Sequence, residues 1–194
     1  MEKFTTLHST AVPLPIENID TDQIIPARFL KVTDKIGFGN HLFCDWRFDS
    51  NHHPIESFVL NNSNYSGTIL VSGNNFGCGS SREHAAWALA DYGFKAVISS
   101  YFADIFKANA LNNGILPIVV SPIFLQNLLI KTQHNPETKI EINLENQTVT
   151  YNEQTENFDI DNYKKICLIN GYDDIDFLLN SLPDIEQFEK QHRS

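Results

Sequence analysis

The sequence has no long apolar run, few cysteines and few basic residues, and each shortage excludes a class of protein. No stretch of its 194 residues approaches the ~20 consecutive apolar residues of a membrane-spanning helix. Its 14 Lys and Arg residues are outnumbered by 24 Asp and Glu residues, and the formal net charge of −10 disfavours nucleic-acid binding. Cys44, Cys78 and Cys167 lie far apart and in no CxxC or histidine-containing cluster, so we expect neither a disulfide framework nor a metal site.

The remaining composition is that of a globular protein. Hydrophobic residues make up 42% of the chain, which supplies a core and excludes intrinsic disorder as the main state. The length predicts one domain, residues 1–194, with appendages. The N-terminal residues lack the apolar segment of a signal peptide, and with the unpaired cysteines this predicts a cytoplasmic protein. Residues 153–189 carry ten acidic residues and two lysines, which we interpret as a solvated face.

Residues 68–132 alternate between short β-branched runs and helix-forming runs, which predicts an α/β fold with parallel βαβαβ units. The sequence carries signals for both ends of the first helix. Ser80 and Glu83 fit a capping box at its N-terminus, and Gly93 fits the left-handed residue that commonly ends a helix. The predicted strands are 68–72, 95–99 and 115–120, and the predicted helices are 80–93, 102–112 and 122–131.

Outside that core the pattern changes. Alternating polar and apolar residues at 138–144 and 148–151 predict an antiparallel hairpin. A further strand is predicted at 166–169 and a late helix at 173–182. Residues 1–66 are rich in proline and turn formers, so we expect long loops with short strands there.

The glycine-rich loop at 73–79 joins a predicted strand to a predicted helix, a place where backbone N–H groups favour an anion. Four familiar kinds of site do not fit it. The run from Gly77 to Arg82 lacks the third glycine of a dinucleotide fingerprint, and no Gly-Lys-Ser/Thr follows to bind phosphate. The same run is not the G-x-S-x-G of a hydrolase. A reactive Cys78 would need His84 as its base, but His84 lies inside the helix and need not face it.

A carboxylate site at Ser80 and Arg82 fits better, because a guanidinium can bind a carboxylate through two parallel hydrogen bonds. A helix dipole is worth roughly 0.3–1 kcal/mol, up to ~2 kcal/mol when partly buried, and one pKa unit is about 1.36 kcal/mol. The dipole alone therefore cannot make Ser80 basic, and Arg82, backbone donors and exclusion of water are also needed. The alternative is that Ser80 only caps the helix while Arg82 is solvated.

The run GNNFGCGSSREHA at 73–85 resembles the signature of the aconitase swivelling-domain family, and within it the small subunits of 3-isopropylmalate dehydratase. The resemblance extends over residues 4–180 in the family's order, without a departure inside the signature, and the tail after Pro183 matches nothing in it. The other similar stretches are NIDTDQIIP at 18–26, RFLK at 28–31, GFGNHLF at 37–43, WR at 46–47, YFADIF at 101–106, NGILP at 113–117 and GYDDI at 171–175.

This resemblance implies a swivelling β/β/α domain that works only with a large subunit. The large subunit would carry a [4Fe–4S] cluster with iron as Lewis acid, so this chain would bind no cofactor or metal and Cys78 would be no cluster ligand. The implied substrate is a small hydroxy diacid. Water would be eliminated from 2-isopropylmalate to give 2-isopropylmaleate, and added again to give 3-isopropylmalate, in leucine biosynthesis. Small subunits that act on citramalate or homoaconitate-type acids, and a non-catalytic carboxylate-binding domain, remain alternatives.

The resemblance also implies roles for individual residues. Ser80 would be the general base that removes the carbon-bound proton, while Ser81 and Arg82 would hold the substrate carboxylate. The loop residues that would support them, or serve as ordinary turn caps, are Asp20, Thr21, Asp22, Gly77 and Gly79.

Specificity has to come from other positions, because the Ser-Ser-Arg core serves the whole family. An apolar pocket prefers a branched alkyl group to a third carboxylate, and the walls we expect for it are Phe29, Leu30 and Val32. Arg28 would oppose such a pocket if it pointed inward, so we interpret it as a surface or subunit-interface charge.

Overall fold

The computed structural model describes residues 1–31 and 36–192, and its centre is a parallel sheet of four strands in the order β2-β3-β4-β5. Helix α3 (Glu83–Tyr92) connects β3 to β4, and helix α4 (Asp104–Asn112) connects β4 to β5. This arrangement confirms the predicted βαβαβ core and adds β2 to it. The four strands are β2 (Ala11–Leu14), β3 (Ile69–Ser72), β4 (Ala96–Ser99) and β5 (Leu116–Val119).

An antiparallel sheet of four strands lies beyond one face of the parallel sheet, in the order β1-β6-β7-β8. The predicted hairpin is confirmed as β6 and β7, with Ile142 opposite Val149. Helix α5 (Pro122–His134) leads from the parallel sheet to this second sheet and extends three residues beyond the predicted end at 131. The strands are β1 (Thr6–Ser9), β6 (Ile140–Asn143), β7 (Thr148–Tyr151) and β8 (Gln154–Asn157).

Residues 15–66 contain more helical turns than the expected loops and short strands. Each turn is only three or four residues long, too short for a hydrophobic period to appear in the sequence. The turns are α1 (Thr21–Ile24), η1 (Ala27–Phe29), η2 (Phe38–His41), α2 (Cys44–Arg47) and η3 (Val59–Asn61).

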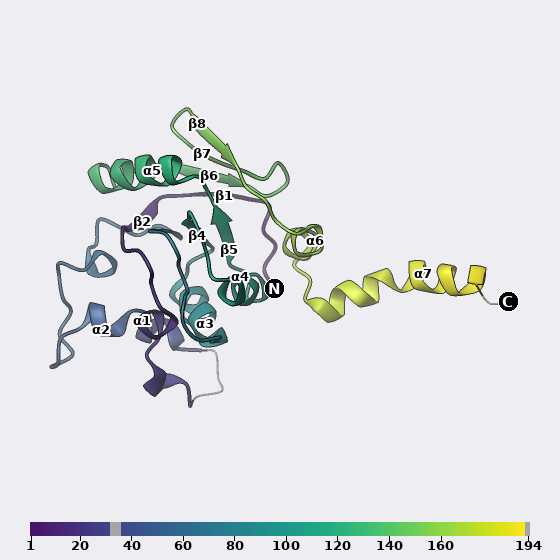
Figure 1. Cartoon of the computed structure of the whole chain (residues 1–194), viewed down its shortest axis with the longest axis horizontal. Helices are drawn as coiled ribbons and strands as arrows, with labels where there is room; N and C mark the ends of the chain where they lie inside the picture. Colours follow the sequence, from purple (N-terminus) through teal and green to yellow (C-terminus); the bar gives the residue numbers. More distant parts are fainter. Residues whose placement is uncertain (32–35, 193–194) are drawn as a thin grey trace.

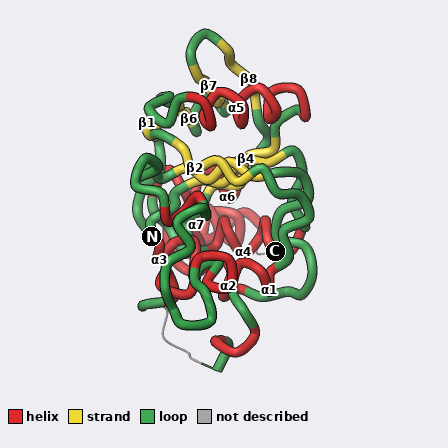
Figure 2. Tube along the Cα trace, turned by 90° about the vertical axis from the view of Figure 1, so that its left-hand side faces the viewer, coloured by secondary structure: helices red, strands yellow, loops and turns green. Residues whose placement is uncertain are grey.

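Both faces of the parallel sheet are buried, as is usual for a sheet with parallel strands. Ile69 belongs to a core shared with α5 and the antiparallel sheet. Its neighbour Leu70 belongs to a second core shared with α1, α3 and α4. Figure 2 shows the resulting layers: the antiparallel sheet with α5, then the parallel sheet, then the helices α1 to α4.

The start of one predicted helix and the type of one predicted element are wrong. Helix α3 begins at Glu83 rather than at Ser80, because the carbonyl oxygen of Ser80 is used in a turn that precedes the helix. The predicted strand at 166–169 lies instead within helix α6 (Asn162–Asn170). The four apolar residues of that run fit either a strand or a helix. The flanking residues favour the helix, because Asp161 caps its N-terminus and Gly171 ends it at a φ of 74°.

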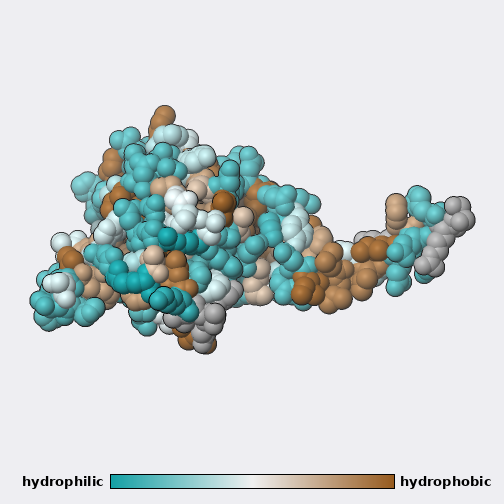
Figure 3. All heavy atoms as spheres, turned by 60° about the horizontal axis from the view of Figure 1, so that its bottom comes forward, coloured by the Kyte–Doolittle hydropathy of each residue, from teal (hydrophilic) through white to brown (hydrophobic). Residues whose placement is uncertain are grey.

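The late helix, α7 (Asp174–His192), begins one residue after the predicted start and runs past residue 182 through Pro183. It extends away from the body of the domain, as Figure 1 shows. Several of its exposed side chains are hydrophobic, as the brown spheres along the arm in Figure 3 illustrate. Among the described residues, no helix is both long enough and apolar enough to cross a membrane.

We expect Ile69→Ala and Leu70→Ala each to lower the free energy of unfolding by about 2–5 kcal/mol. Both side chains are fully buried, and they belong to opposite faces of the parallel sheet. Ile123→Ala, at an exposed position of α5, should change the free energy by less than about 0.5 kcal/mol. Urea denaturation of the three variants measures these values. A small effect at either strand position would contradict the burial of both faces.

Candidate active site

The glycine-rich loop is held by the chain segment that precedes α1. We call residues 73–82 the signature loop and residues 18–22 the facing segment. The backbone N–H groups of Gly77 and Cys78 both donate to the carbonyl oxygen of Ile19, over 2.8 and 3.2 Å. In return the N–H of Thr21 donates to the carbonyl oxygen of Cys78 over 2.9 Å. The facing segment therefore fixes the path of the signature loop by backbone hydrogen bonds that depend little on side chains.

Gly77 and Gly79 are the two glycines of the signature loop that have a left-handed backbone conformation. Their φ angles are 76° and 89°, in the left-handed region that L residues rarely adopt. Space is lacking as well, since a Cβ on Gly77 would overlap the ring of Phe106 and a Cβ on Gly79 would overlap the Asp20 carboxylate. The structure thus gives a physical reason for both glycines in the supporting loop.

Ser80 does not cap helix α3, so the predicted capping box is wrong. Arg82 occupies the N-cap position, and no side chain makes a cap hydrogen bond there. The carbonyl oxygen of Ser80 accepts hydrogen bonds from Thr21 Oγ1 at 3.0 Å and from the Arg82 N–H at 2.8 Å. These bonds turn the chain before the helix begins, and they leave Ser80 and Ser81 exposed on the surface.

Arg82 is held in place by Asp22 of the facing segment. Its Nη1 forms an ion pair with Asp22 Oδ1, and only 19% of the Arg82 side chain is exposed, against 51% for Asp22. A guanidinium has five N–H donors, so an ion pair through Nη1 leaves others for a substrate carboxylate. A mostly buried, charge-paired arginine next to two exposed serines is an arrangement with which an anion could pair.

Asp20 and Thr21 act on the backbone of the same region. Asp20 is the N-cap of α1: its carboxylate accepts from the Asp22 N–H at 2.6 Å, and its own N–H donates to Gln23 Oε1 at 2.8 Å. Thr21 is buried, and its hydroxyl is committed to the carbonyl oxygen of Ser80. Both residues therefore shape the loop rather than offer a group to a substrate.

Cys78 is not arranged as a nucleophile. Its Sγ lies 3.4 Å from the carbonyl oxygen of Asn18, and burial together with the nearby Asp20 carboxylate raises the pKa of the thiol. His84 packs against Phe38 and Trp87, with ring centroids 5.5 and 4.4 Å away. A protonated thiol and a histidine in an aromatic cluster argue against cysteine chemistry at this loop.

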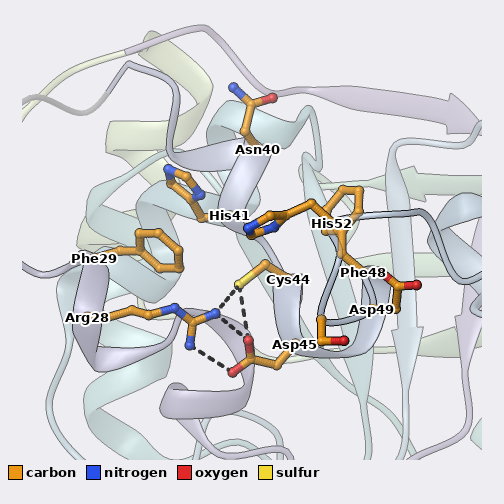
Figure 4. Close-up of a pocket in the computed structure, with 10 residues that line it drawn as sticks. Arg28, Phe29, Asn40, His41, Cys44, Asp45, Phe48, Asp49 and His52 are labelled. Atoms are coloured by element: carbon orange, nitrogen blue, oxygen red, sulfur yellow. Dashed lines mark hydrogen bonds and ion pairs between the residues drawn. The ribbon is translucent and has the colours of Figure 1, made fainter.

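A cavity of about 630 Å³ lies elsewhere, around the turn that carries Arg28 and Phe29. Figure 4 shows Arg28 paired with Asp45, and Nη1 lies 3.0 Å from Oδ2. This pairing lowers the pKa of the Asp45 carboxyl. The Phe29 ring stacks on His41 with centroids 3.9 Å apart, and burial together with the Arg28 charge lowers the pKa of His41. Arg28 is thus an exposed charge paired within this chain.

This cavity is lined by Phe29 but by none of residues 80–82. Leu30 is partly buried against the second core, and Val32 lies outside the described residues. Among the described residues, this cavity therefore does not join Phe29 to the signature loop. Sequence reasoning missed Asp45 and His41 as partners of the turn, and pairing between two short loops leaves no periodic signal by which to find it.

The three cysteines are free, with Cys44 and Cys167 buried. In the described part of the chain, no three His, Cys, Asp or Glu side chains are grouped so that they could hold a metal ion. Among the described residues, the three cysteines belong to no such group.

Comparison with known proteins identifies close relatives. Residues 1–122 match the aconitase C-terminal domain family. The 3-isopropylmalate dehydratase small subunit of Christiangramia forsetii is 64% identical over 195 residues, covering 100% of this chain and 95% of that protein. The subunit of the same name from Cytophaga hutchinsonii is 58% identical over 192 residues, covering 98% and 96%. A crystal structure of 3-isopropylmalate dehydratase from Methanocaldococcus jannaschii has 27% identity and a TM-score of 0.64, covering 95% of this chain and 99% of that one.

We expect Gly79→Ala to destabilise the protein by about 1 kcal/mol more than Gly37→Ala. Both glycines have a φ of 89°, so both substitutions incur the left-handed backbone cost of roughly 1–2 kcal/mol. Only at Gly79 does the new Cβ also displace Asp20 from its cap on α1, because Gly37 has nothing within 4 Å. Urea denaturation of the two variants gives the difference, and equal costs would show that the contact with Asp20 is not constraining.

Proposed function

Because the chain belongs to the aconitase family and, within it, to the 3-isopropylmalate dehydratase small subunits, we propose that it is the small subunit of a hydro-lyase of leucine biosynthesis. The proposal covers the interconversion of 2-isopropylmalate and 3-isopropylmalate through 2-isopropylmaleate. The observation that carries it is the exposure of Ser80 and Ser81 beside Arg82, which Asp22 holds in place. Such a surface offers half of an active site, and a second subunit has to supply the rest.

In this proposal Ser80 moves the proton. The deprotonated Oγ takes the proton from the substrate carbon, the C–H electron pair forms the double bond, and hydroxide leaves the neighbouring carbon with the electrons of the C–O bond. Hydroxide then adds to the carbon that lost the proton, and the Ser80 Oγ–H returns its proton to the other carbon, which regenerates the deprotonated Ser80. Loss of the hydroxyl is assigned to chemistry supplied by the large subunit's [4Fe–4S] cluster.

Ser80 needs help to act as a base, and the helix dipole gives little of it. Helix α3 begins three residues beyond Ser80, and the dipole effect declines within the first turn. The positive charge of Arg82 and the exclusion of water by the large subunit are therefore the main sources of stabilisation for a deprotonated Ser80. This is a physical reason for an exposed Ser80 to be inactive until the large subunit covers it.

Arg82 and Ser81 hold the carboxylate of the substrate in this proposal. The ion pair with Asp22 fixes the guanidinium before the substrate arrives, so little side-chain freedom is lost on binding. Phe29, Leu30 and Val32 stay the proposed walls of an alkyl pocket that the large subunit would complete. We also place the protein in the cytoplasm, since a reducing compartment fits its three free cysteines.

The first test is turnover by the chain mixed with a cluster-loaded large subunit under anaerobic conditions. We expect 2-isopropylmaleate to form from 3-isopropylmalate only in the mixture, with neither subunit active alone and with citramalate a poorer substrate. Preference for citramalate or a homoaconitate-type acid would keep the mechanism and change the substrate. Assembly without turnover on any hydroxy diacid would indicate a non-catalytic carboxylate-binding domain instead.

Ser80→Ala should lower kcat by roughly 10²–10⁴-fold, the usual contribution of a general acid–base group. Assembly with the large subunit should be unchanged, because Ser80 uses its backbone carbonyl and not its hydroxyl in the described fold. Ser63→Ala, at another exposed serine, is the matched control and should keep full activity. Loss of the complex in the Ser80 variant would make Ser80 a structural residue.

Arg82→Lys should raise KM by roughly 10-fold or more, because a lysine cannot make the forked contact and one charge-assisted hydrogen bond is lost. Asp22→Asn should raise KM by a smaller factor with kcat less affected, because it loosens Arg82 without removing it. Glu2→Gln breaks an exposed ion pair with Lys95 and serves as the control. Steady-state kinetics of the assembled enzyme separates the two parameters, and an unchanged KM in Asp22→Asn would contradict its positioning role.

A further inference from the structure

Helix α7 carries a row of exposed hydrophobic side chains that nothing in the described chain covers. Ile175, Leu178, Leu179 and Leu182 are 67%, 60%, 57% and 46% exposed. We call these four residues the α7 stripe. Exposed leucines are common singly, but a contiguous row of four is typical of an interaction surface. Figure 3 shows the hydrophobic side chains gathered along this arm.

The spacing of the α7 stripe is i, i+3, i+4 and i+7, the pattern by which an amphipathic helix places anchor residues in a groove of a partner. At about 100° per residue, these four side chains lie within a sector of roughly 100° on one side of the helix. Leu182, the last residue of the stripe, directly precedes Pro183, which lacks the N–H of a regular helical hydrogen bond, and Ile185 and Phe188 are exposed beyond it. The anchors therefore form one short, coherent face.

The base of α7 is fixed to the domain, so the stripe is presented in a defined direction. The Phe177 ring packs edge-on against Tyr163 of α6, with centroids 4.5 Å apart. Lys164 of α6 donates to Asp174 Oδ1 at 3.1 Å. Phe177 is about 200° around the helix from Ile175, so this contact uses the side opposite the stripe and leaves the stripe outward.

Charge identifies the kind of partner. Asp176 flanks the stripe about 100° from Ile175, whereas Asp174, on the other side, is already paired with Lys164. The helix as a whole holds five acidic residues and one lysine, in a chain of net charge −10. Two copies packed stripe to stripe would bring these carboxylates together, which is unfavourable. An apolar groove bordered by Lys or Arg side chains fits both the stripe and its flanks.

We propose that the α7 stripe is the anchor by which this chain docks into an apolar, basic-rimmed groove of its large subunit. This inference rests on the proposed function, which supplies the large subunit, and it assigns the surface that binds it. The stripe is separate in the sequence from the signature loop, so affinity for the large subunit and chemistry at Ser80 can be altered independently.

The test titrates the full chain with the large subunit and measures complex formation by sedimentation velocity, with turnover in parallel. The double variant Leu178→Ser/Leu179→Ser should raise the Kd about 10-fold or more. Its kcat at a saturating concentration of the large subunit should equal that of the unsubstituted chain. Ile123→Ser, at a 75% exposed position of α5, is the matched control and should leave the Kd within about twofold.

Each possible outcome either supports or overturns the proposed docking surface. An unchanged Kd in the double variant, when the unsubstituted chain binds, would overturn the proposal. A dimer of the chain alone that the double variant dissolves would also overturn it and assign the stripe to a second copy. Binding without turnover, lost in the double variant, would support the docking surface while contradicting the proposed function. A Kd that does not rise with salt would contradict the basic rim, because exposed charge pairs are screened.

Discussion

The candidate site depends on the way in which two loops hold each other, far more than on the sheet beneath them. The facing segment and the signature loop exchange backbone hydrogen bonds between Ile19 and Gly77 and between Thr21 and Cys78. Their side chains then complete the arrangement, since Asp22 holds Arg82 by an ion pair. A pairing of this kind fixes the serines without burying them. Because backbone bonds set the path, the exposed ends of Ser80 and Ser81 stay free for a reaction.

The parts of the fold that could be predicted are those in which local pattern and burial agree. Strands were identified from the β-branched runs at 69–72 and 96–99, which are buried along their whole length. The hairpin was identified from the alternation at 140–151, where every second side chain is buried. Where a run was short and apolar throughout, as at 166–169, pattern alone could not separate strand from helix. The decision there came from Asp161 and Gly171 at the ends of α6.

The residues of the candidate site were proposed from the sequence, and the structure corrects part of the geometry expected for them. The residue types and spacing of 77–82 indicated an anion site, but the N-cap assignment of Ser80 was wrong. A capping box requires a free N–H at N3 and a chain that enters the helix directly. Here the Ser80 carbonyl is bonded to Thr21, 59 residues away in the sequence, and the chain turns before the helix begins. The residue pattern at 80–83 could not reveal this turn, because the hydrogen bond comes from Thr21 in a distant part of the sequence.

An active site divided between two chains places opposite demands on their contact. In the proposed reaction, the surface around Ser80 would open for the substrate to enter and close to exclude water, so its contacts with the large subunit would be neither tight nor permanent. Lasting affinity has to come from a second surface that does not move with the site. A helix that leaves the domain and exposes the α7 stripe meets that demand. Once α7 is docked, the signature loop stays at a high effective concentration near its counterpart, and weak contacts suffice to close the site.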